Sequence, residues 1–320
     1  MSKLPLEIWR EICCLACKDD GTTGRSLGLV SQYVRSVSEE YRYYSIAVAG
    51  PRQVRGLHEV LKSAPLARVR HLYFVDPRDY VSGLSVVVLP RRTEDIAAIN
   101  NLLEAVSPTL FSLTIVSHTT RQTFNGDHIA LHPLQFPLLT ELTLRGCYTV
   151  PPTELFAPRL ARLHISSEAV NRSLGQSLSK YYSELTHLRI SRLMEFISDI
   201  LGIMEDLTSA MGLRRPPTES QDEWVSTMPT IPRYILIQPG PESWQGSEGR
   251  VVLSDPRRRR GMLLPLQLYE WRLKYFTVLP PHVGYGRERE AELAKAEWLD
   301  RINWGPGCWD ILNANKPLSL

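Results

Sequence analysis

A short pattern of apolar residues recurs along most of the chain and limits the folds open to it more than any other feature. Each copy has an apolar residue, two spacers, a second apolar residue, one spacer and a third apolar residue. Because side chains alternate between the faces of a β-strand, the last two apolar residues of a copy lie on one face of a short strand. The clear copies are Leu110, Leu113, Ile115; Leu139, Leu142, Leu144; Leu160, Leu163, Ile165; and Leu185, Leu188, Ile190, and looser ones are Tyr43, Ile46, Val48; Val69, Leu72, Phe74; and Ile231, Tyr234, Leu236.

Helical patterns lie in several intervals between these strands. Residues 51–63, 93–106 and 192–212 each carry an apolar stripe at helical spacing, and Pro51 and Thr93 suit the beginnings of the first two. Strands joined by helical crossovers are parallel. The intervals between copies are unequal, which predicts insertions of variable length in the connections. We therefore expect an α/β fold, an irregular solenoid of parallel strands with helical crossovers.

The N-terminal region predicts two short helices ahead of the repeats. Between residues 5 and 16, Ile8, Ile12 and Leu15 recur at helical spacing, and a second stripe runs from Leu27 to Tyr41. Helices this short bury too little area to be stable alone. Their stripes must meet each other, the first repeat at Ile46 and Val48, or another protein.

The C-terminal region predicts one further helix. Residues 287–303 place Ala291, Ala294, Trp298 and Ile302 on one apolar face. An array of repeats needs its open end covered, so we expect this helix to cap the end of the solenoid. Residues 239–281 are punctuated by Pro and Gly and give no clear pattern.

Composition narrows the classes of partner and compartment. The 320 residues carry 37 basic and 34 acidic side chains, a net charge of +3, which provides no general attraction to nucleic acid or an anionic membrane. No apolar run reaches the roughly 20 residues of a membrane helix. Five cysteines, an odd number, do not suggest a disulfide framework. We expect a cytoplasmic or nuclear protein, and the run Arg257–Arg260 is either a solvated loop or a nuclear import or anion-binding segment.

The opening residues resemble a known family. Leu4-Pro5-Leu6-Glu7-Ile8, then Ile12, then Leu27-Gly28-Leu29-Val30-Ser31 and Arg35 resemble the F-box, in the divergent form of F-box-like proteins from mushroom-forming fungi. Gln32 and Val34 stand where the F-box usually has Lys and Trp. The apolar copies that follow look like the irregular leucine-rich repeats of the same family.

The resemblance implies an organisation and a function. It implies an F-box-like helical module at 1–48, irregular leucine-rich repeats at 49–238, and a C-terminal segment with a capping helix at 239–320. Proteins of this kind are non-catalytic adaptors that dock on the SKP-family linker of an SCF-type cullin ubiquitin ligase and hold a protein substrate on their repeats. The alternative is a leucine-rich interaction module without a ubiquitin-ligase link. The expected linker contacts are Leu4, Pro5, Ile8, Ile12, Leu27, Val30 and Val34.

The spacers of the repeat strands define a candidate substrate surface. They point to the face opposite the apolar residues, the concave face of a leucine-rich array. This set is polar and biased towards guanidinium and imidazole groups, which suits an acidic or phosphorylated segment of a protein substrate. An ordinary solvated sheet face is the alternative. The candidates are His71, Tyr73, Arg145, Arg162, His164, His187 and Arg189.

Catalytic, metal and cofactor sites are not expected. Gly24-Arg25-Ser26-Leu27-Gly28 matches the nucleophile-elbow pattern, but no strand precedes Ser26. Cys13, Cys14 and Cys17 lack the spacing of zinc ligands and are read as buried small side chains. His128 and His132 lie in a loop-like segment and are a weak metal pair. We expect no catalytic residue, no metal, no cofactor, and no nucleic-acid or membrane partner.

Overall fold

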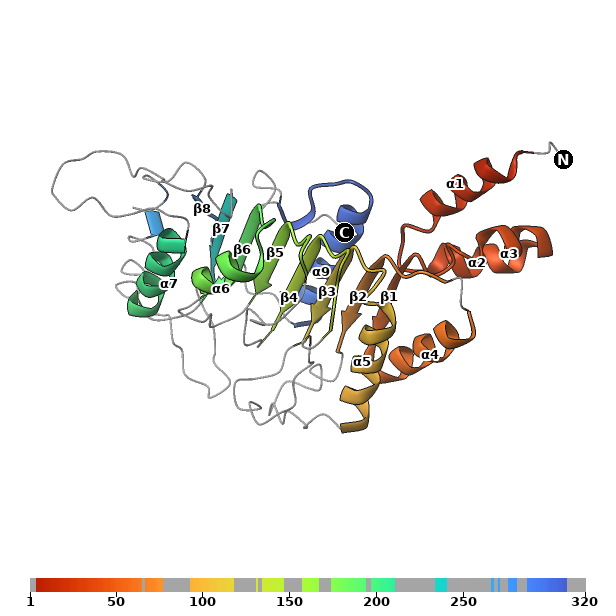
Figure 1. The fold of residues 1–320 in the computed structure, drawn as a ribbon, viewed down its shortest axis with the longest axis horizontal. Coiled ribbons are helices and arrows are strands. Elements are labelled where there is room, and N and C mark those ends of the chain that lie inside the picture. The colour runs from red at the N-terminus through yellow and green to blue at the C-terminus, as the bar shows by residue number, and fades with distance from the viewer. Residues whose placement is uncertain are drawn as a thin grey trace.

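The computed structural model describes most of the regular elements of the chain. It describes residues 4–64, 67–76, 93–117, 131, 134–146, 157–166, 174–193, 197–210, 234–240, 266–267, 270, 276–280 and 287–309. The central element is a sheet of eight parallel strands whose spatial order is their order in the chain (Figure 1). The α/β prediction with parallel strands and crossovers is confirmed. The strands are β1 Ser45–Ala49, β2 His71–Val75, β3 Ser112–Val116, β4 Glu141–Arg145, β5 Arg162–Ser166, β6 His187–Leu193, β7 Tyr234–Pro239 and β8 Phe276–Val278.

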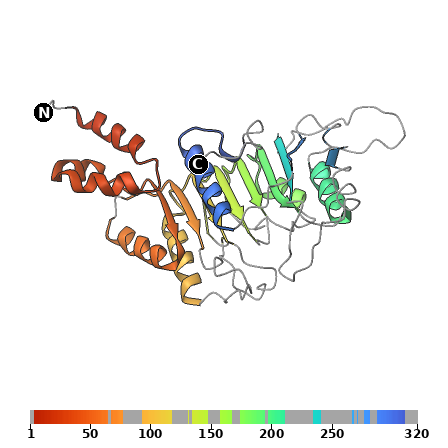
Figure 2. The same cartoon turned by 180° about the vertical axis from the view of Figure 1, so that it is seen from behind.

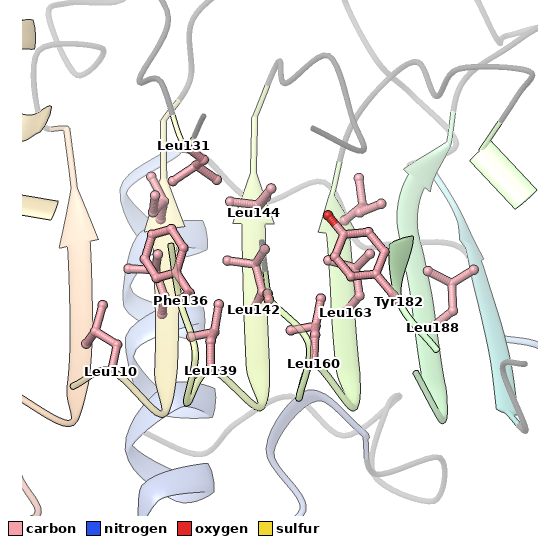
Figure 3. Close-up of a cluster of buried hydrophobic side chains, with 14 of the residues drawn as sticks. Leu110, Leu131, Phe136, Leu139, Leu142, Leu144, Leu160, Leu163, Tyr182 and Leu188 are labelled. Carbon is pink, nitrogen blue, oxygen red and sulfur yellow. The ribbon is translucent and has the colours of Figure 1, made fainter. Parts of the chain in front are cut away.

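The repeated apolar residues stand in register across the sheet. Leu72, Leu113, Leu142, Leu163 and Leu188 are successive partners, so the second apolar position of each copy forms one continuous row. Figure 3 shows Leu142, Leu163 and Leu188 of this row, with neighbouring core side chains, on one face of the strands. Each side chain is at most 1% exposed, and full burial of a leucine contributes about 1.5–3 kcal/mol. The repeat therefore supplies the core of the protein.

Four helices cover this apolar face. α4 Gly50–Ser63 packs against α5 Thr93–Val106, and α6 Leu174–Tyr181 packs against α7 Ile197–Ala210. Their inward residues, such as Leu57, Ile99, Leu178 and Met204, join the same core cluster as the strand leucines. The predicted helix at 192–212 is shorter than expected because Arg192 and Leu193 continue strand β6.

The last predicted copy is out of register by one residue. Ile235 and Ile237 belong to the core, whereas Tyr234 is 46% exposed and Leu236 lies on the other face. The segment Tyr234-Ile235-Leu236-Ile237 is apolar at both alternating sets of positions. A period-two pattern cannot choose between two apolar faces, so the sequence did not fix which face is inward.

The C-terminal helix lies on the second face of the sheet and not at its end. Helix α9, Arg287–Ile302, passes behind the strands in Figure 1 and in front of them in Figure 2, where the view is reversed. Its apolar stripe of Ala291, Ala294, Trp298 and Ile302 packs on Tyr73 and Val116. The prediction of an end cap is wrong, because a single apolar stripe on a helix does not specify which surface it will cover.

Three helices precede the sheet, where two were predicted. They are α1 Leu6–Ala16, α2 Thr22–Val30 and α3 Gln32–Ser38. Ser31 separates α2 from α3 with an extended backbone, and its Oγ accepts a hydrogen bond from the Val34 N–H at 3.2 Å as the N-cap of α3. Ser26 lies within α2 and donates its Oγ–H to the Thr22 carbonyl. This helical placement excludes the strand-to-helix turn that a nucleophile elbow requires.

Candidate protein-interaction surfaces

Helices α1 to α3 expose a set of large apolar side chains, which we call the N-terminal apolar surface. On α1, residues at helical spacing share one face, and Ile8 and Ile12 are each 43% exposed. On α2, Leu29 is 80% exposed. Monomeric proteins rarely gather so many exposed large apolar residues without a partner. The surface consists of Leu4, Leu6, Ile8, Ile12, Leu15, Leu29, Val30 and Tyr33.

Most of the predicted linker contacts lie on or beside this surface. Leu4, Pro5, Ile8, Ile12 and Val30 are exposed, and Leu27 is partly buried. Val34 is buried, and so its predicted exposure is wrong. The N-cap at Ser31 sets the rotation of α3 and turns Val34 inward with Val37.

Four exposed residues of the surface were missed by the sequence reading. Leu6, Leu15, Leu29 and Tyr33 were not among the predicted contacts. The signal for Leu15 was present, because it continues the α1 stripe one turn beyond Ile12. The exposure of Leu29 and Tyr33 depends on the break between α2 and α3 at Ser31. The continuous apolar stripe from Leu27 to Tyr41 gave no sign of this break.

The N-terminal helices join the body of the protein through the loop before α2. The Ser45 Oγ–H donates to the Asp19 carbonyl at 2.6 Å, and the Ala47 N–H donates to the Asp20 carbonyl at 3.2 Å. The Asp20 carboxylate pairs with Lys295 of α9 at 2.8 Å. The hydrogen bond from Lys295 lowers the pKa of Asp20 to about 2. These contacts hold the loop while Ile8 and Ile12 on α1 stay exposed.

Helix α9 and the following short helix η3, Gly307–Trp309, cover the face that was predicted to hold a substrate. Arg145 pairs with Glu297, and Arg192 pairs with Glu290 at 2.7 Å. Arg189 donates to the Cys308 carbonyl and to Gln238 Oε1. A solvated concave face was expected, and at Arg145 and Arg189 that expectation is wrong because both side chains are buried and have partners within the chain.

Two aromatic side chains of the predicted surface are also buried beneath this segment. The Tyr73 hydroxyl donates to the Ala291 carbonyl at 2.7 Å, and its ring contacts Trp298. His164 is fully buried, with Nε2 hydrogen-bonded to Ser191 Oγ at 2.8 Å. The sequence placed both residues on the correct face but gave no indication of what covers it.

His71 lies near the N-terminal end of the same face. Its Nδ1 is 2.9 Å from Ser112 Oγ, and its ring packs edge-on against Tyr44. Burial, with smaller contributions from Lys18 and Arg70, lowers the pKa of His71 to about 4. The imidazole is therefore neutral at physiological pH, which does not suit the capture of an anion.

Three neighbouring residues at the starts of β5, β6 and β7 form what we call the strand-start cluster. Arg162 is the register partner of His187, and His187 is the register partner of Tyr234. The His187 and Tyr234 rings stack with centroids 4.9 Å apart, and Tyr234 is 46% exposed. Burial and then the charge of Arg162 lower the pKa of His187. Arg162 and His187 are partly exposed, and Arg162 forms no ion pair with a described residue, so these two predicted residues can contact a partner.

One group of metal-ligand types occurs among the described residues. Ligand atoms of His164, Glu297 and Cys308 lie within 4.8 Å of one another. However, Glu297 pairs with Arg145, and burial raises the pKa of the Cys308 thiol to about 12. Thiolate is the form that binds a metal, and the neighbouring guanidinium groups oppose a divalent cation. The group is better explained by the packing of the C-terminal segment.

The remaining sequence candidates have mixed outcomes. Cys13 and Cys17 are buried in and just after α1, as predicted, while Cys14 is partly exposed. Burial raises the pKa of Cys17 to about 12, so its thiol is inert. His128, His132 and the run Arg257–Arg260 lie outside the described residues.

Comparison with known proteins does not assign the chain to a family. No family model matches the chain, and no curated protein matches its sequence. Within the described part of the chain, none of the helices combines the length and apolarity needed to cross a membrane.

Proposed function

We propose that the protein is a non-catalytic substrate adaptor of an SCF-type cullin ubiquitin ligase. In this proposal helices α1 to α3 dock on the SKP-family linker, and the repeats hold a protein substrate. Ubiquitin transfer then depends on proximity, because the adaptor raises the local concentration of substrate beside the catalytic partner.

The observation that carries the proposal is the N-terminal apolar surface. Helices α1 and α2 expose Ile8, Ile12, Leu29 and Val30 although the apolar core of the sheet begins nearby in the chain, at Val48 of β1. Exposed apolar side chains on amphipathic helices are the usual anchors of helix-mediated recognition. The residues that carry the F-box resemblance and the residues of this surface coincide at six positions, which supports docking of a partner at this place. These are Leu4, Leu6, Ile8, Ile12, Leu29 and Val30.

The rival function is an interaction module without a ubiquitin link, in which the helices only cover the first repeat. The burial of Val34 favours it. Ile8 and Ile12 favour docking, because Ile46 of β1 packs against the repeat core while both α1 residues stay exposed. Of Ile8, Ile12 and Val34, the first two are thus available to a partner.

The proposed substrate surface is narrower than the sequence suggested. Helix α9 occupies the centre of the concave face, so we place substrate contact at the strand-start cluster of Arg162, His187 and Tyr234. The guanidinium group of Arg162 suits an acidic or phosphorylated segment, and the exposed ring of Tyr234 offers an apolar contact beside it.

The test is binding of the full-length protein to the SKP-family linker of a mushroom-forming fungus, measured by isothermal titration calorimetry. We expect the Ile8→Asp variant to bind at least about 30-fold more weakly, because a central interface residue contributes about 2 kcal/mol or more. The matched control is Val60→Asp, which places the same charge at an exposed apolar position on α4.

Two results would contradict the adaptor function. One is the absence of saturable binding by a wild-type chain that melts cooperatively. The other is equal loss of affinity in Ile8→Asp and Val60→Asp, because this would show that the α1 stripe is not the contact. Either result would leave the rival interaction module.

A further inference from the structure

A cavity of about 1020 Å³ lies where the N-terminal helices, the first strand and the C-terminal helix meet. It follows the free edge of β1 and reaches both faces of the sheet. On the core side its wall is apolar and includes Ile46, Val48, Leu57 and Val60. On the opposite side the wall is formed by Ala47, Ala49, Tyr73, Val75 and Ala291. The volume is at the upper end of the range for sites that hold a small organic ligand.

The charged groups that line the cavity include more cations than anions. Lys295 and Asp20 neutralise each other at 2.8 Å. Arg25 and Arg42 also line the cavity, and neither forms an ion pair with any residue that the structure describes. Glu292, which is exposed, is the remaining acid in the wall. Two guanidinium groups without a carboxylate partner beside a large apolar wall are the features expected of a site for an organic anion.

Of the two arginines, Arg42 has the stronger need for an oxyanion partner. Its Nε is buried and has no hydrogen-bond partner. Its guanidinium carbon lies 5.4 Å from the centre of the Tyr43 ring and would lie 3.6 Å from a Cβ added at Gly28 of α2. A buried donor without a partner costs about 1–3 kcal/mol, so an oxyanion that accepted from it would recover that cost. Arg25 has one hydrogen bond, from its Nε to the Gly21 carbonyl at 3.1 Å, which leaves its terminal nitrogens available.

The edge of β1 argues against a peptide strand as the occupant. A peptide that extended the sheet would have to accept hydrogen bonds from the outward N–H groups of β1. The Ala47 N–H already donates to the Asp20 carbonyl at 3.2 Å, and the Ala49 N–H donates to Gln53 Oε1 at 2.8 Å. The chain thus satisfies these two edge donors itself, and side-chain chemistry defines the ligand.

We propose that this cavity binds a small amphipathic organic anion. The apolar body of the ligand lies against Leu57 and Val60, and its carboxylate or phosphate pairs with Arg42 and Arg25. The site does not depend on the proposed adaptor function, because none of its residues belongs to the N-terminal apolar surface or the strand-start cluster.

The test is calorimetric titration of the full-length protein with octanoate, octyl phosphate and 1-octanol. These three probes share one apolar chain, and the two anions distinguish a carboxylate from a phosphate head. We expect saturable binding of at least one anion at one site per chain and binding of octanol weaker by about tenfold or more, since a charge-assisted hydrogen bond is lost. Arg25→Gln and Arg42→Gln should each weaken the anion by about tenfold and leave octanol unchanged, whereas the control Arg52→Gln on α4 should bind as wild type.

Three outcomes would overturn the proposal. They are no saturable binding of either anion at millimolar concentration, equal affinity for octanol and the anions, and unchanged anion binding by Arg25→Gln. Thermal melts monitored by circular dichroism accompany each variant. If Arg42→Gln does not fold, the exposed Arg25 decides the result. Loss of binding in Ile8→Asp with Arg25→Gln unaffected would assign the alkyl chain to the N-terminal apolar surface and also overturn the proposal.

Discussion

Arg301 of α9 donates hydrogen bonds from two nitrogens to the Glu141 carboxylate at the start of β4. Its Nε lies 3.0 Å and its Nη2 2.9 Å from Glu141 Oε2, and Glu141 Oε1 also accepts from the Trp309 indole at 3.0 Å. Both side chains are largely buried, at 22% and 12% exposure. This pairing fixes the C-terminal segment on the polar face of the sheet with a geometry that lysine could not provide.

Removing the Glu141 charge should therefore destabilise the protein. We expect Glu141→Gln to lower the free energy of unfolding by about 2–3 kcal/mol, because Arg301 then remains largely buried without an anion. The control is Glu59→Gln, which breaks a pair with Lys62 on the surface of α4. That change should have a much smaller effect on the free energy of unfolding, because solvent screens this exposed pair. Urea denaturation of the three proteins gives the comparison, and equal losses in the two variants would disprove the structural role of the Glu141 pair.

The row of strand leucines should be intolerant of truncation. Leu142 is 1% exposed at the centre of the row, so Leu142→Ala should cost about 3–5 kcal/mol from lost burial and the cavity left behind. Leu29→Ala, at a position 80% exposed, should change stability by less than about 0.5 kcal/mol. A Leu142→Ala melting temperature equal to that of wild type would contradict the core assignment.

Stability should fall on acidification because of His71. Burial lowers the pKa of this imidazole from 6.5 to about 4 in the folded protein. Between these values the unfolded chain binds the proton and the folded chain does not, so the contribution is present above about 6.5 and is lost as the pH falls through 4. We expect a loss on the order of 2 kcal/mol across this window. His71→Asn should have a shallower slope of unfolding free energy between pH 6.5 and 4, and an unchanged slope would refute the prediction.

Two helical glycines should respond in opposite ways to alanine. A Cβ at Gly24 of α2 would lie 2.2 Å from the Arg42 carbonyl oxygen, whereas nothing lies within 4 Å of a Cβ at Gly56 of α4. We expect Gly24→Ala to destabilise the protein by about 2 kcal/mol through this overlap. Gly56→Ala should be neutral or stabilise it by up to about 1 kcal/mol, because alanine favours the helix. Thermal melts compare them, and similar melting temperatures would contradict the close packing of α2.

The repeat made most of the fold predictable. The local pattern at Leu113, Leu142 and Leu163 predicts where the strands lie, which face of each is buried and that the strands are parallel. The helices at 51–63 and 93–106 follow from their apolar stripes at helical spacing. Strand β7 was misplaced by one residue because Tyr234 to Ile237 are apolar on both faces. The location of α9 could not be derived, because its partners Tyr73, Arg145 and Glu141 are distant in the chain and look like solvated spacers.

The candidate sites were predictable only where a local pattern in the sequence determines them. The exposure of Ile8 and Ile12 follows from a stripe on a helix too short to stand alone. Val34 is buried in a separate helix that begins after the extended residue Ser31, and the unbroken apolar stripe does not reveal this break. The cavity at Arg42 requires three segments that come together only in the folded protein. Local periodicity identifies faces, but long-range packing decides which faces remain open.

The position of α9 also has a consequence for the order in which the protein is made. Tyr73, Arg145, Arg189 and Arg192 lie in strands that leave the ribosome well before residues 287–309. Until residues 287–309 emerge, these side chains of the nascent sheet remain in contact with water. They are buried only when this C-terminal segment packs on the sheet. Neighbouring repeats of a simple solenoid can fold in turn as they are synthesised. Here the second strand and the sixth both contact α9, so full stability is reached only after synthesis of the C-terminal segment.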